Sequence, residues 1–173
     1  GSHRPGVVRR KSGVVQVGVV GRLVSVKRVD IFLRVCQILH STSGRVVRGW
    51  VIGDGPLMGR LRQEAKSLEI SGLVEMPGFV DNVPASLAEL DVLLLTSDNE
   101  GLPMVLLEAM ALGTPVVAHA VGGIPQALDE GKCGTLVDKQ DPQCYADAVT
   151  KILENPTEAM DRSQRARMRV QDH

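Results

Sequence analysis

The sequence has few aromatic residues, no closely spaced cysteines and no excess of charge of either sign. Its 173 residues include one Trp, one Tyr and two Phe, so stacking platforms for single-stranded nucleic acid are not expected. Twenty basic residues balance twenty acidic ones, which gives no reason to expect nucleic acid or an anionic membrane as a partner. The three cysteines lack a C-x-x-C spacing, which argues against a disulfide framework and a zinc site. We expect them to be buried, small apolar side chains in a reducing compartment.

Long apolar runs and targeting signals are also missing. No run reaches the roughly 18 residues that a membrane-spanning helix needs, and no signal peptide is recognised, so we expect a cytoplasmic protein. Residues 1–3 resemble a protease scar from a purification tag, and residues 1–13 together are expected to be this scar and a basic linker. The hydrophobic content of 43% suits one globular domain, which we place at residues 14–157.

Six runs rich in β-branched and apolar residues alternate with helical patterns along the chain. The runs cover residues 14–20, 45–52, 72–78, 91–96, 114–120 and 134–138. Continuous apolar character is typical of parallel strands that are covered on both faces. The alternation predicts an α/β fold, a doubly wound, Rossmann-like parallel sheet of six strands.

Helical periodicity appears after the first two runs and again near the end, where Asp141-Pro142 is a helix-start signal. The tail, residues 158–173, contains four arginines. It is expected to be either a helix with a solvated basic face or a strap that contacts another domain.

An acidic residue interrupts the apolar helix expected within NEGLPMVLLEAMALG, residues 99–113. Burying Glu108 there without a partner would cost several kcal/mol. Glu108 lies one turn beyond Met104 on the same helix face, where its carboxylate could accept two hydrogen bonds from a vicinal diol such as a ribose. The alternative is that Glu108 faces solvent or pairs with a nearby arginine.

The start of this helix has the features of an anion-binding corner. Ligands of open parallel sheets bind beyond the carboxyl ends of the strands, and this segment follows the fourth run. Pro103 suits the first helical position, which would leave the amides of Met104 and Val105 pointing into the crevice with the positive end of the helix dipole. Gly101 lets a ligand approach the backbone closely.

The longer string SDNEGLPMVLLEAMALGTPVVAHAVGGIPQAL, residues 97–128, resembles the nucleotide-sugar site of retaining glycosyltransferases of family four. The signature of that family is E-x(7)-E within E-G-x-x-x-x-x-x-E-A-M-A-x-G-x-P-V-V. The matching positions are Glu100, Gly101, Glu108, Ala109, Met110, Ala111, Gly113, Pro115, Val116 and Val117. The resemblance extends over most of residues 14–155 and implies the C-terminal half of a two-domain GT-B enzyme.

Residues 21–30, GRLVSVKRVD, resemble the family element G-R-L-x-x-x-K-G-x-D, whose Arg and Lys hold the donor diphosphate. Arg22 and Lys27 occupy those positions. Two fixed cations can stabilise a departing nucleoside diphosphate without a metal. Arg28 stands where the family usually has Gly. Without the resemblance, Arg22 and Lys27 would be ordinary surface residues.

Residues 51–61, VIGDGPLMGRL, match the second strand–helix turn of the family, at Gly53. The same segment offers a rival interpretation, because three glycines from Gly53 to Gly59, with Glu75 further on, mimic a dinucleotide-binding fingerprint. Met58 stands where the third glycine of that fingerprint belongs, which disfavours an NAD(P) site.

Two further segments resemble parts of the donor site. Residues 76–90 resemble the element that meets the base, so Phe79 and Val80 are candidates for contacting it; the alternative for Phe79 is core packing. Residues 120–128 resemble the loop near the sugar, but Gln126 replaces the usual Glu.

The resemblance implies the donor-binding domain of a hexosyltransferase that uses a UDP or GDP sugar, retains anomeric configuration and needs no metal or cofactor. Glu100 would be the catalytic residue, beside the reacting sugar, as a nucleophile, an electrostatic aid or a clamp on the sugar. The implied donor-binding residues are Arg22, Lys27, Gly53, Phe79, Val80, Gly101, Leu102, Pro103, Met104, Val105 and Glu108. The implied product class is a polysaccharide or glycolipid.

The implied partners are the nucleotide-sugar donor and an N-terminal acceptor-binding domain, without which we expect this domain to be inactive. A peripheral membrane contact at the inner face stays open for the full-length protein. The alternatives are a sugar-nucleotide epimerase or phosphorylase of the same fold, and a non-catalytic nucleotide-binding module. The sequence contains no G-x-S-x-G, H-E-x-x-H or Walker motif for other chemistry.

Overall fold

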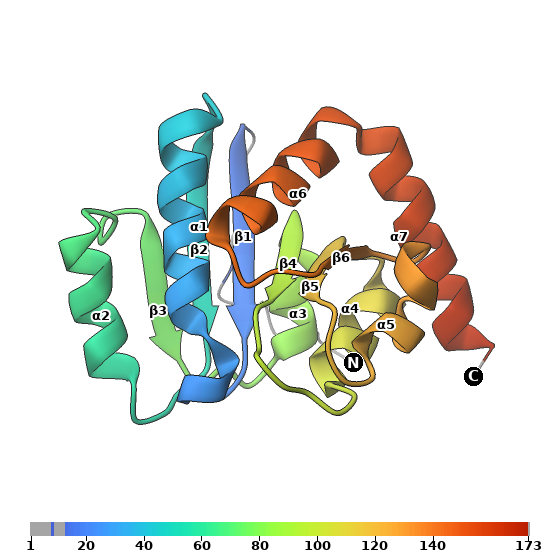
Figure 1. The fold of residues 1–173 in the computed structure, drawn as a ribbon, viewed down its shortest axis with the longest axis horizontal. Helices are drawn as coiled ribbons and strands as arrows, with labels where there is room; N and C mark the ends of the chain where they lie inside the picture. Colours follow the sequence, from blue (N-terminus) through green and yellow to red (C-terminus); the bar gives the residue numbers. More distant parts are fainter. Residues whose placement is uncertain (1–7, 9–12, 173) are drawn as a thin grey trace.

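A computed structural model describes residue 8 and residues 13–172. Its centre is a sheet of parallel strands in the order β3-β2-β1-β4-β5-β6 (Figure 1). The strands are β1 (Val14–Val20), β2 (Val46–Ile52), β3 (Val74–Gly78), β4 (Val92–Leu95), β5 (Val116–His119) and β6 (Thr135–Val137). Each strand lies within one of the six predicted runs, so the doubly wound parallel sheet is confirmed.

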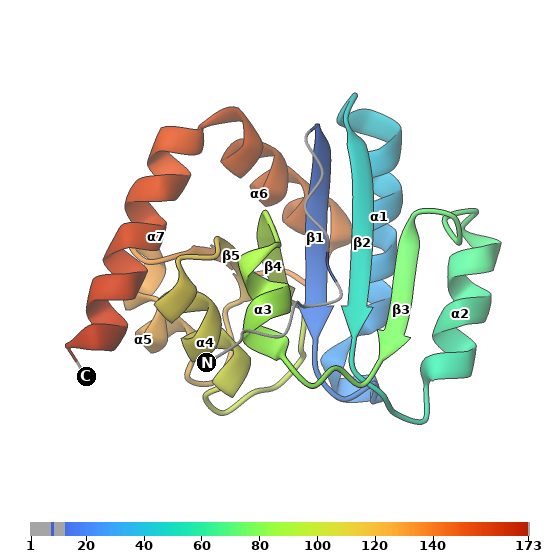
Figure 2. The same cartoon turned by 180° about the vertical axis from the view of Figure 1, so that it is seen from behind.

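Helices cover both faces of the sheet. They are α1 (Val29–Thr42), α2 (Met58–Ser67), α3 (Val83–Ala88), α4 (Met104–Leu112), α5 (Ile124–Ala127), α6 (Pro142–Glu154) and α7 (Pro156–Gln171), with 3-10 turns η1 (Ser25–Lys27) and η2 (Asp129–Gly131). Helices α1, α2 and α6 lie on one face, and α3 and α4 lie on the other (Figures 1 and 2). As predicted, Asp141 caps α6, because its carboxylate accepts a hydrogen bond from the amide of Gln143.

The two faces of the sheet bury two separate apolar cores. In β4, Val92 and Leu94 pack into the core under α1 and α6, while Leu93 and Leu95 pack into the core under α3 and α4. Successive side chains of a strand point to opposite faces. A strand covered on both sides must therefore be apolar at every position, which explains the unbroken run in the sequence.

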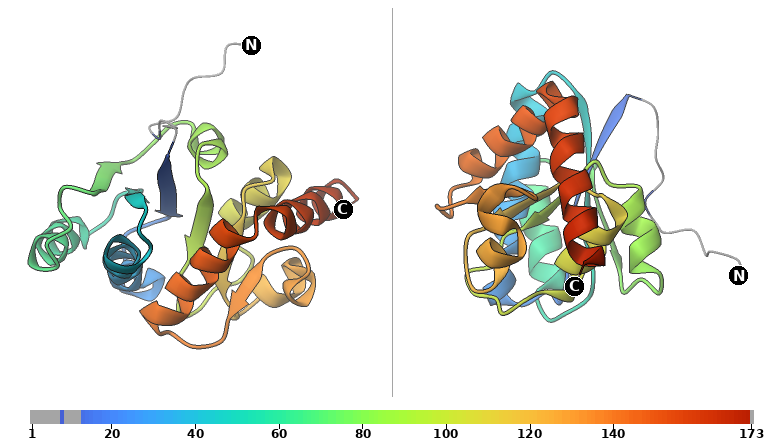
Figure 3. Two further views of the ribbon diagram at one scale, coloured as in Figure 1. Left: turned by 90° about the horizontal axis from the view of Figure 1, so that it is seen from above. Right: turned by 90° about the vertical axis from the view of Figure 1, so that its right-hand side faces the viewer.

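The chain changes from one face to the other between α6 and α7. Tyr145 and Val149 of α6 belong to the first core, whereas Ala166 of α7 belongs to the second, and α7 packs on α4 (Figure 3). The tail beyond residue 157 is therefore a helix that is part of the domain packing, and α7 itself begins at Pro156.

The predicted basic face of α7 is only partly solvated, because Arg165 and Arg167 are exposed whereas Arg162 and Arg169 are half-buried. Arg162, Arg165 and Arg169 each donate hydrogen bonds to the stretch of chain from α5 to β6. The acceptors are the hydroxyl of Thr135 at 3.1 Å, the carbonyl of Lys132 at 2.8 Å and the carbonyls of Ala127 and Gln126 at 3.1 and 2.9 Å. Guanidinium groups thus tie α7 to the far end of the sheet.

Several smaller predictions can also be compared with the structure. Val8, inside the predicted linker, is buried, while the rest of that linker except Gly13 lies outside the described residues. Cys36 and Cys133 are buried, as predicted, and burial raises the pKa of both thiols; Cys144 is only half-buried. Within the described part of the chain, every helix is too short or too polar to span a bilayer.

Candidate functional site

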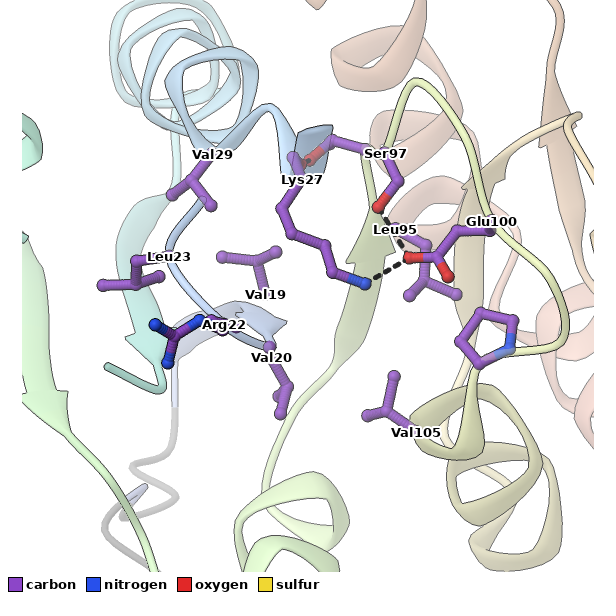
Figure 4. Close-up of a pocket in the computed structure, with 13 residues that line it drawn as sticks. Val19, Val20, Arg22, Leu23, Lys27, Val29, Leu95, Ser97, Glu100 and Val105 are labelled. Carbon is purple, nitrogen blue, oxygen red and sulfur yellow. Dashed lines mark hydrogen bonds and ion pairs between the residues drawn. The ribbon is translucent and has the colours of Figure 1, made fainter. Parts of the chain in front are cut away.

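The order of the strands places a switch point between β1 and β4. Connections from these neighbouring strands run to opposite sides of the sheet, so the loops after them diverge and leave a crevice at their carboxyl ends. A hollow lies there, between the segment that follows β1 and the loop from β4 to α4. We call it the inner hollow. Its polar lining comes from Arg22, Lys27, Thr96, Ser97 and Glu100 (Figure 4).

An ion pair joins the two sides of the inner hollow. The Nζ atom of Lys27 lies 2.5 Å from Oε1 of Glu100, and the hydroxyl of Ser97 donates to the same oxygen at 2.8 Å (Figure 4). The Glu100 side chain is only 10% exposed, and that of Lys27 is 28% exposed. Residues predicted separately, 73 positions apart in the chain, are therefore in direct contact.

The loop that carries Glu100 is held by hydrogen bonds and by a close backbone contact with Gly122. The Nδ1 atom of His119 lies 2.7 Å from the carbonyl oxygen of Ser97, and the amide of Gly123 donates to the carbonyl of Gly101 at 2.8 Å. At Gly122, whose φ is +58°, a Cβ atom would lie 1.5 Å from the carbonyl oxygen of Glu100. Only glycine fits there, so the double glycine of the predicted sugar loop packs directly against the backbone of Glu100 and Gly101.

Arg28 takes the left-handed conformation, with φ of +49°, at the start of α1. The glycine expected there would adopt it freely, whereas a side chain makes it cost on the order of 1 kcal/mol. Two interactions offset that cost: the guanidinium of Arg28 pairs with Asp30 and Asp98, and the hydroxyl of Thr96 donates to its carbonyl. The turn therefore forms with Arg28 in place of the glycine that is usual in the family.

A polar bridge through Gln140, which lies just before α6, supports the loop from β4 to α4 and was not predicted. The side-chain amide of Gln140 donates to the carbonyl of Thr96 at 2.7 Å and to Asp98 at 2.9 Å, and its oxygen accepts a hydrogen bond from the buried Tyr145 hydroxyl. The bond from Gln140 lowers the pKa of Asp98, and the nearby Arg28 adds to this effect. Nothing in the local sequence signals this bridge, because it joins segments that only the fold brings together.

A second hollow adjoins the first and shares Arg22 with it. We call it the outer hollow; it lies after β1, β2 and β3 and is lined mainly by apolar groups. Its lining includes Val20, Arg22, Ile52, Gly53, Asp54, Phe79, Val80 and Val83. Phe79 is 77% exposed, so core packing, the alternative left open for it, is wrong. Gly53 is required sterically, because a Cβ atom there would lie 1.9 Å from the carbonyl oxygen of Gly21.

The start of α4 differs slightly from the prediction. Pro103 is the residue before the helix, not its first residue, and α4 begins at Met104. The amide of Leu106 is the first to bond within the helix, to the carbonyl of Pro103 at 3.1 Å. Pro103 and Val105 line the inner hollow, whereas Leu102 and Met104 are exposed apolar side chains that are not part of its lining.

Glu108 is half-buried, so the cost expected from full burial does not arise. Its carboxylate makes no hydrogen bond or ion pair with any residue that the structure describes, which leaves both oxygens available. Glu108 is not part of the lining of the inner hollow, unlike Pro103 and Val105 at the start of the same helix. Its contact with a ribose therefore stays a prediction.

The dinucleotide interpretation does not fit the geometry. Gly53 follows β2 and not β1, and Glu75 lies near the start of β3, where it pairs with Arg48 at 2.6 Å. The acid of a dinucleotide site instead lies beyond the end of its strand. Among residues 8 and 13–172, no group of three His, Cys, Asp or Glu side chains is arranged to hold a metal ion.

The structure thus brings Arg22, Lys27 and Glu100 to one hollow, and Arg22, Gly53, Phe79 and Val80 to the adjoining one. These features define a Rossmann-like α/β domain with a charged crevice at its switch point.

The chain belongs to the family described as Glycosyl transferases group 1, whose model matches residues 6–169. It is 33% identical over 167 residues to the putative colanic acid biosynthesis glycosyltransferase WcaL of Escherichia coli, covering 92% of this chain and 40% of that protein. It is 35% identical over 146 residues to the N-acetyl-alpha-D-glucosaminyl L-malate synthase of Bacillus anthracis, covering 84% of this chain and 38% of that protein. The chain therefore spans about two fifths of the length of these relatives.

A solved structure, HepE of Anabaena in complex with UDP, superposes with a TM-score of 0.84 at 24% identity, covering 93% of this chain and 45% of HepE. This likeness confirms the Rossmann-like fold that the sequence predicts, with GT-B proteins as structural neighbours. The family match agrees with the resemblance to glycosyltransferases and favours neither the epimerase nor the non-catalytic alternative.

Proposed function

We propose that this chain is the donor-binding domain of a retaining glycosyltransferase of family four, which transfers a sugar from a nucleoside-diphosphate sugar without a metal ion. The observation that supports this proposal most directly is the convergence of Arg22, Lys27 and Glu100 in the inner hollow, at the switch point of the sheet. Two cations and one carboxylate in one crevice match a ligand that combines a diphosphate with a hydroxyl-rich sugar.

Each charged group has a role that follows from its chemistry. Negative charge grows on the diphosphate as it leaves, and the guanidinium of Arg22 and the ammonium of Lys27 stabilise it there. Glu100 orients the sugar through its hydroxyls and stabilises positive charge that develops on the ring. Glu108, on α4, accepts hydrogen bonds from the ribose diol.

The outer hollow would take the base. Phe79 offers an exposed ring for stacking, and Val80 and Gly53 allow close contact with a flat ligand. The UDP in the HepE complex belongs to that protein, yet it makes UDP the first nucleotide to test here. Polysaccharide synthesis, a cytoplasmic location and a contact with the membrane are parts of the proposal that concern the whole protein.

The acceptor would bind to another domain. Because the chain spans about two fifths of its relatives, we expect it to bind donor weakly and to transfer almost no sugar alone. A radiolabelled-donor assay tests this expectation, and sustained transfer by this chain would contradict it.

Isothermal titration calorimetry with UDP, GDP and ADP, in buffer containing EDTA, tests donor binding. We expect one nucleotide to bind, and Lys27→Ala and Glu108→Ala each to weaken it by about tenfold or more, as the loss of a charge-assisted hydrogen bond predicts. Glu75→Gln, which breaks an exposed ion pair outside both hollows, is the matched control and should leave binding unchanged. Absence of binding by all three nucleotides would contradict the proposal, and binding that requires a divalent metal would contradict metal independence.

A further inference from the structure

The two residues assigned to different parts of the donor are bound to each other in this structure. Lys27 is proposed to hold the diphosphate and Glu100 the sugar, yet the Nζ atom of Lys27 lies 2.5 Å from Oε1 of Glu100. Ser97 donates to that same oxygen. The pair is not a loose surface contact, because the Glu100 side chain is 90% covered.

Separating such a pair is costly for the group that remains behind. An ion pair at the surface contributes little, but a buried carboxylate that loses its cation keeps the full desolvation penalty. A nucleoside diphosphate that takes Lys27 would leave Glu100 with the Ser97 hydroxyl alone and bring further negative charge close to it. A sugar attached to the diphosphate changes this balance, since its hydroxyls can donate to the carboxylate.

We propose that the Lys27–Glu100 ion pair is exchanged when the donor binds, and that this exchange makes the site favour a nucleotide sugar over the free nucleoside diphosphate. Lys27 passes from Glu100 to the diphosphate, and Glu100 passes from Lys27 to hydroxyls of the sugar. The pair thereby couples recognition of the two halves of the donor and disfavours retention of the diphosphate product. This inference rests on the proposed function and adds a selectivity role to its two residues.

Glu100→Gln is the decisive variant. It removes the charge but keeps an oxygen that can accept from Ser97, and it frees Lys27. We expect UDP, GDP or ADP, whichever binds the unmodified chain, to bind the variant about fivefold more tightly, the effect of a partly buried ion pair. The corresponding UDP-glucose, GDP-mannose or ADP-glucose should bind no more tightly, because the variant also loses the carboxylate that receives the sugar hydroxyls.

Two other variants complete the calorimetric experiment. Lys27→Met should weaken diphosphate binding more in the Glu100→Gln background than in the unmodified chain, because Lys27 is then fully available to the ligand. Glu75→Gln removes an ion pair of similar length, 2.6 Å, on the exposed surface of β3, and should change neither affinity. Glu100→Ala replaces Glu100→Gln if the latter does not fold, since it also removes the carboxylate that pairs with Lys27; it should also tighten diphosphate binding.

The outcomes separate this inference from the proposed function. Unchanged or weaker binding of the diphosphate to Glu100→Gln, or an equal change for diphosphate and nucleotide sugar, overturns the exchange while the donor site stands. No binding of any nucleotide to the unmodified chain or to any variant overturns the proposed function, and the exchange with it.

Discussion

The inner and outer hollows are both lined by Arg22, but they differ in whether their other lining side chains already have hydrogen-bond or ion-pair partners. In the inner hollow, Lys27 and Ser97 both bind Glu100, and the loop that carries Glu100 is held by close contact with Gly122 and by a hydrogen bond from Gln140. In the outer hollow, Phe79 is exposed and its neighbours are mainly apolar. Charged groups near the interior need partners whether or not a ligand is present, whereas an aromatic ring at the surface does not.

The largest effect on stability should come from adding a side chain at Gly122, which packs against the loop that carries Glu100. In Gly122→Ala, a Cβ atom would lie 1.5 Å from the carbonyl oxygen of Glu100, so the loop must move. We expect a loss of roughly 2–4 kcal/mol in the free energy of unfolding, measured by urea denaturation. Gly44→Ala has a similar φ, +68°, but meets nothing within 4 Å. It should lose only about 1 kcal/mol, and equal losses in both variants would contradict the account.

Arg22→Ala removes a charged side chain that lines both hollows. The side chain is exposed, and it has no hydrogen bond or ion pair with the residues that the structure describes, so stability should change by less than about 0.5 kcal/mol. Nucleotide affinity, measured by calorimetry, should fall about tenfold or more through the loss of a charged contact with phosphate. A large change in stability with unchanged affinity would show that Arg22 is a structural residue and not a phosphate ligand.

Phe79→Ala tests the outer hollow alone. Loss of base stacking should weaken nucleotide binding by about five- to tenfold, with almost no change in melting temperature. Met160→Ala, which truncates another exposed apolar side chain (68% exposed) far along the chain on α7, should change neither quantity. If Phe79→Ala lowers the melting temperature and leaves affinity intact, Phe79 is a structural residue.

The smallest effect is expected at Asp98, in the loop that carries Glu100, and it concerns the pH dependence of stability. The Gln140 hydrogen bond lowers the pKa of Asp98, so the ionised carboxylate stabilises the fold above the ordinary carboxyl pKa, and this contribution is lost as the pH falls through the lowered pKa. With the Asp98 side chain 46% exposed, the contribution should be well under about 1 kcal/mol. Urea unfolding should show Asp98→Asn less stable than the unmodified chain at pH 7, and this difference should shrink as the pH falls below the ordinary carboxyl pKa. A difference that persists in acid would assign it to another cause.

Sequence patterns predicted the sheet because a strand covered on both faces must be apolar throughout, as β4 is. They also placed Arg22 and Glu100 at one edge, because parallel strands end on the same side of a sheet. The contact between Lys27 and Glu100 could not be predicted, since it depends on side-chain conformations in two loops 73 residues apart. The hydrogen bonds of Gln140 could not be predicted either, because they also join segments that are far apart in the chain.

Other features escaped prediction for local reasons. Helix α5 has only four residues, too few to show a helical period. Most of the hydrogen bonds from the arginines of α7 go to carbonyl groups, which any residue can supply, so the sequence contained no signal for them. Only a structure could show that Phe79 is exposed, because an aromatic ring suits a core and a ligand site equally well.

The most direct test of the account is a crystal structure of this chain with the nucleotide sugar that binds it best. We predict the diphosphate against Arg22 and Lys27, with the Nζ atom of Lys27 moved away from Glu100 and the carboxylate of Glu108 on the ribose hydroxyls. A donor bound outside the inner hollow, or a ribose without contact to Glu108, would contradict the proposal that this crevice is the donor site.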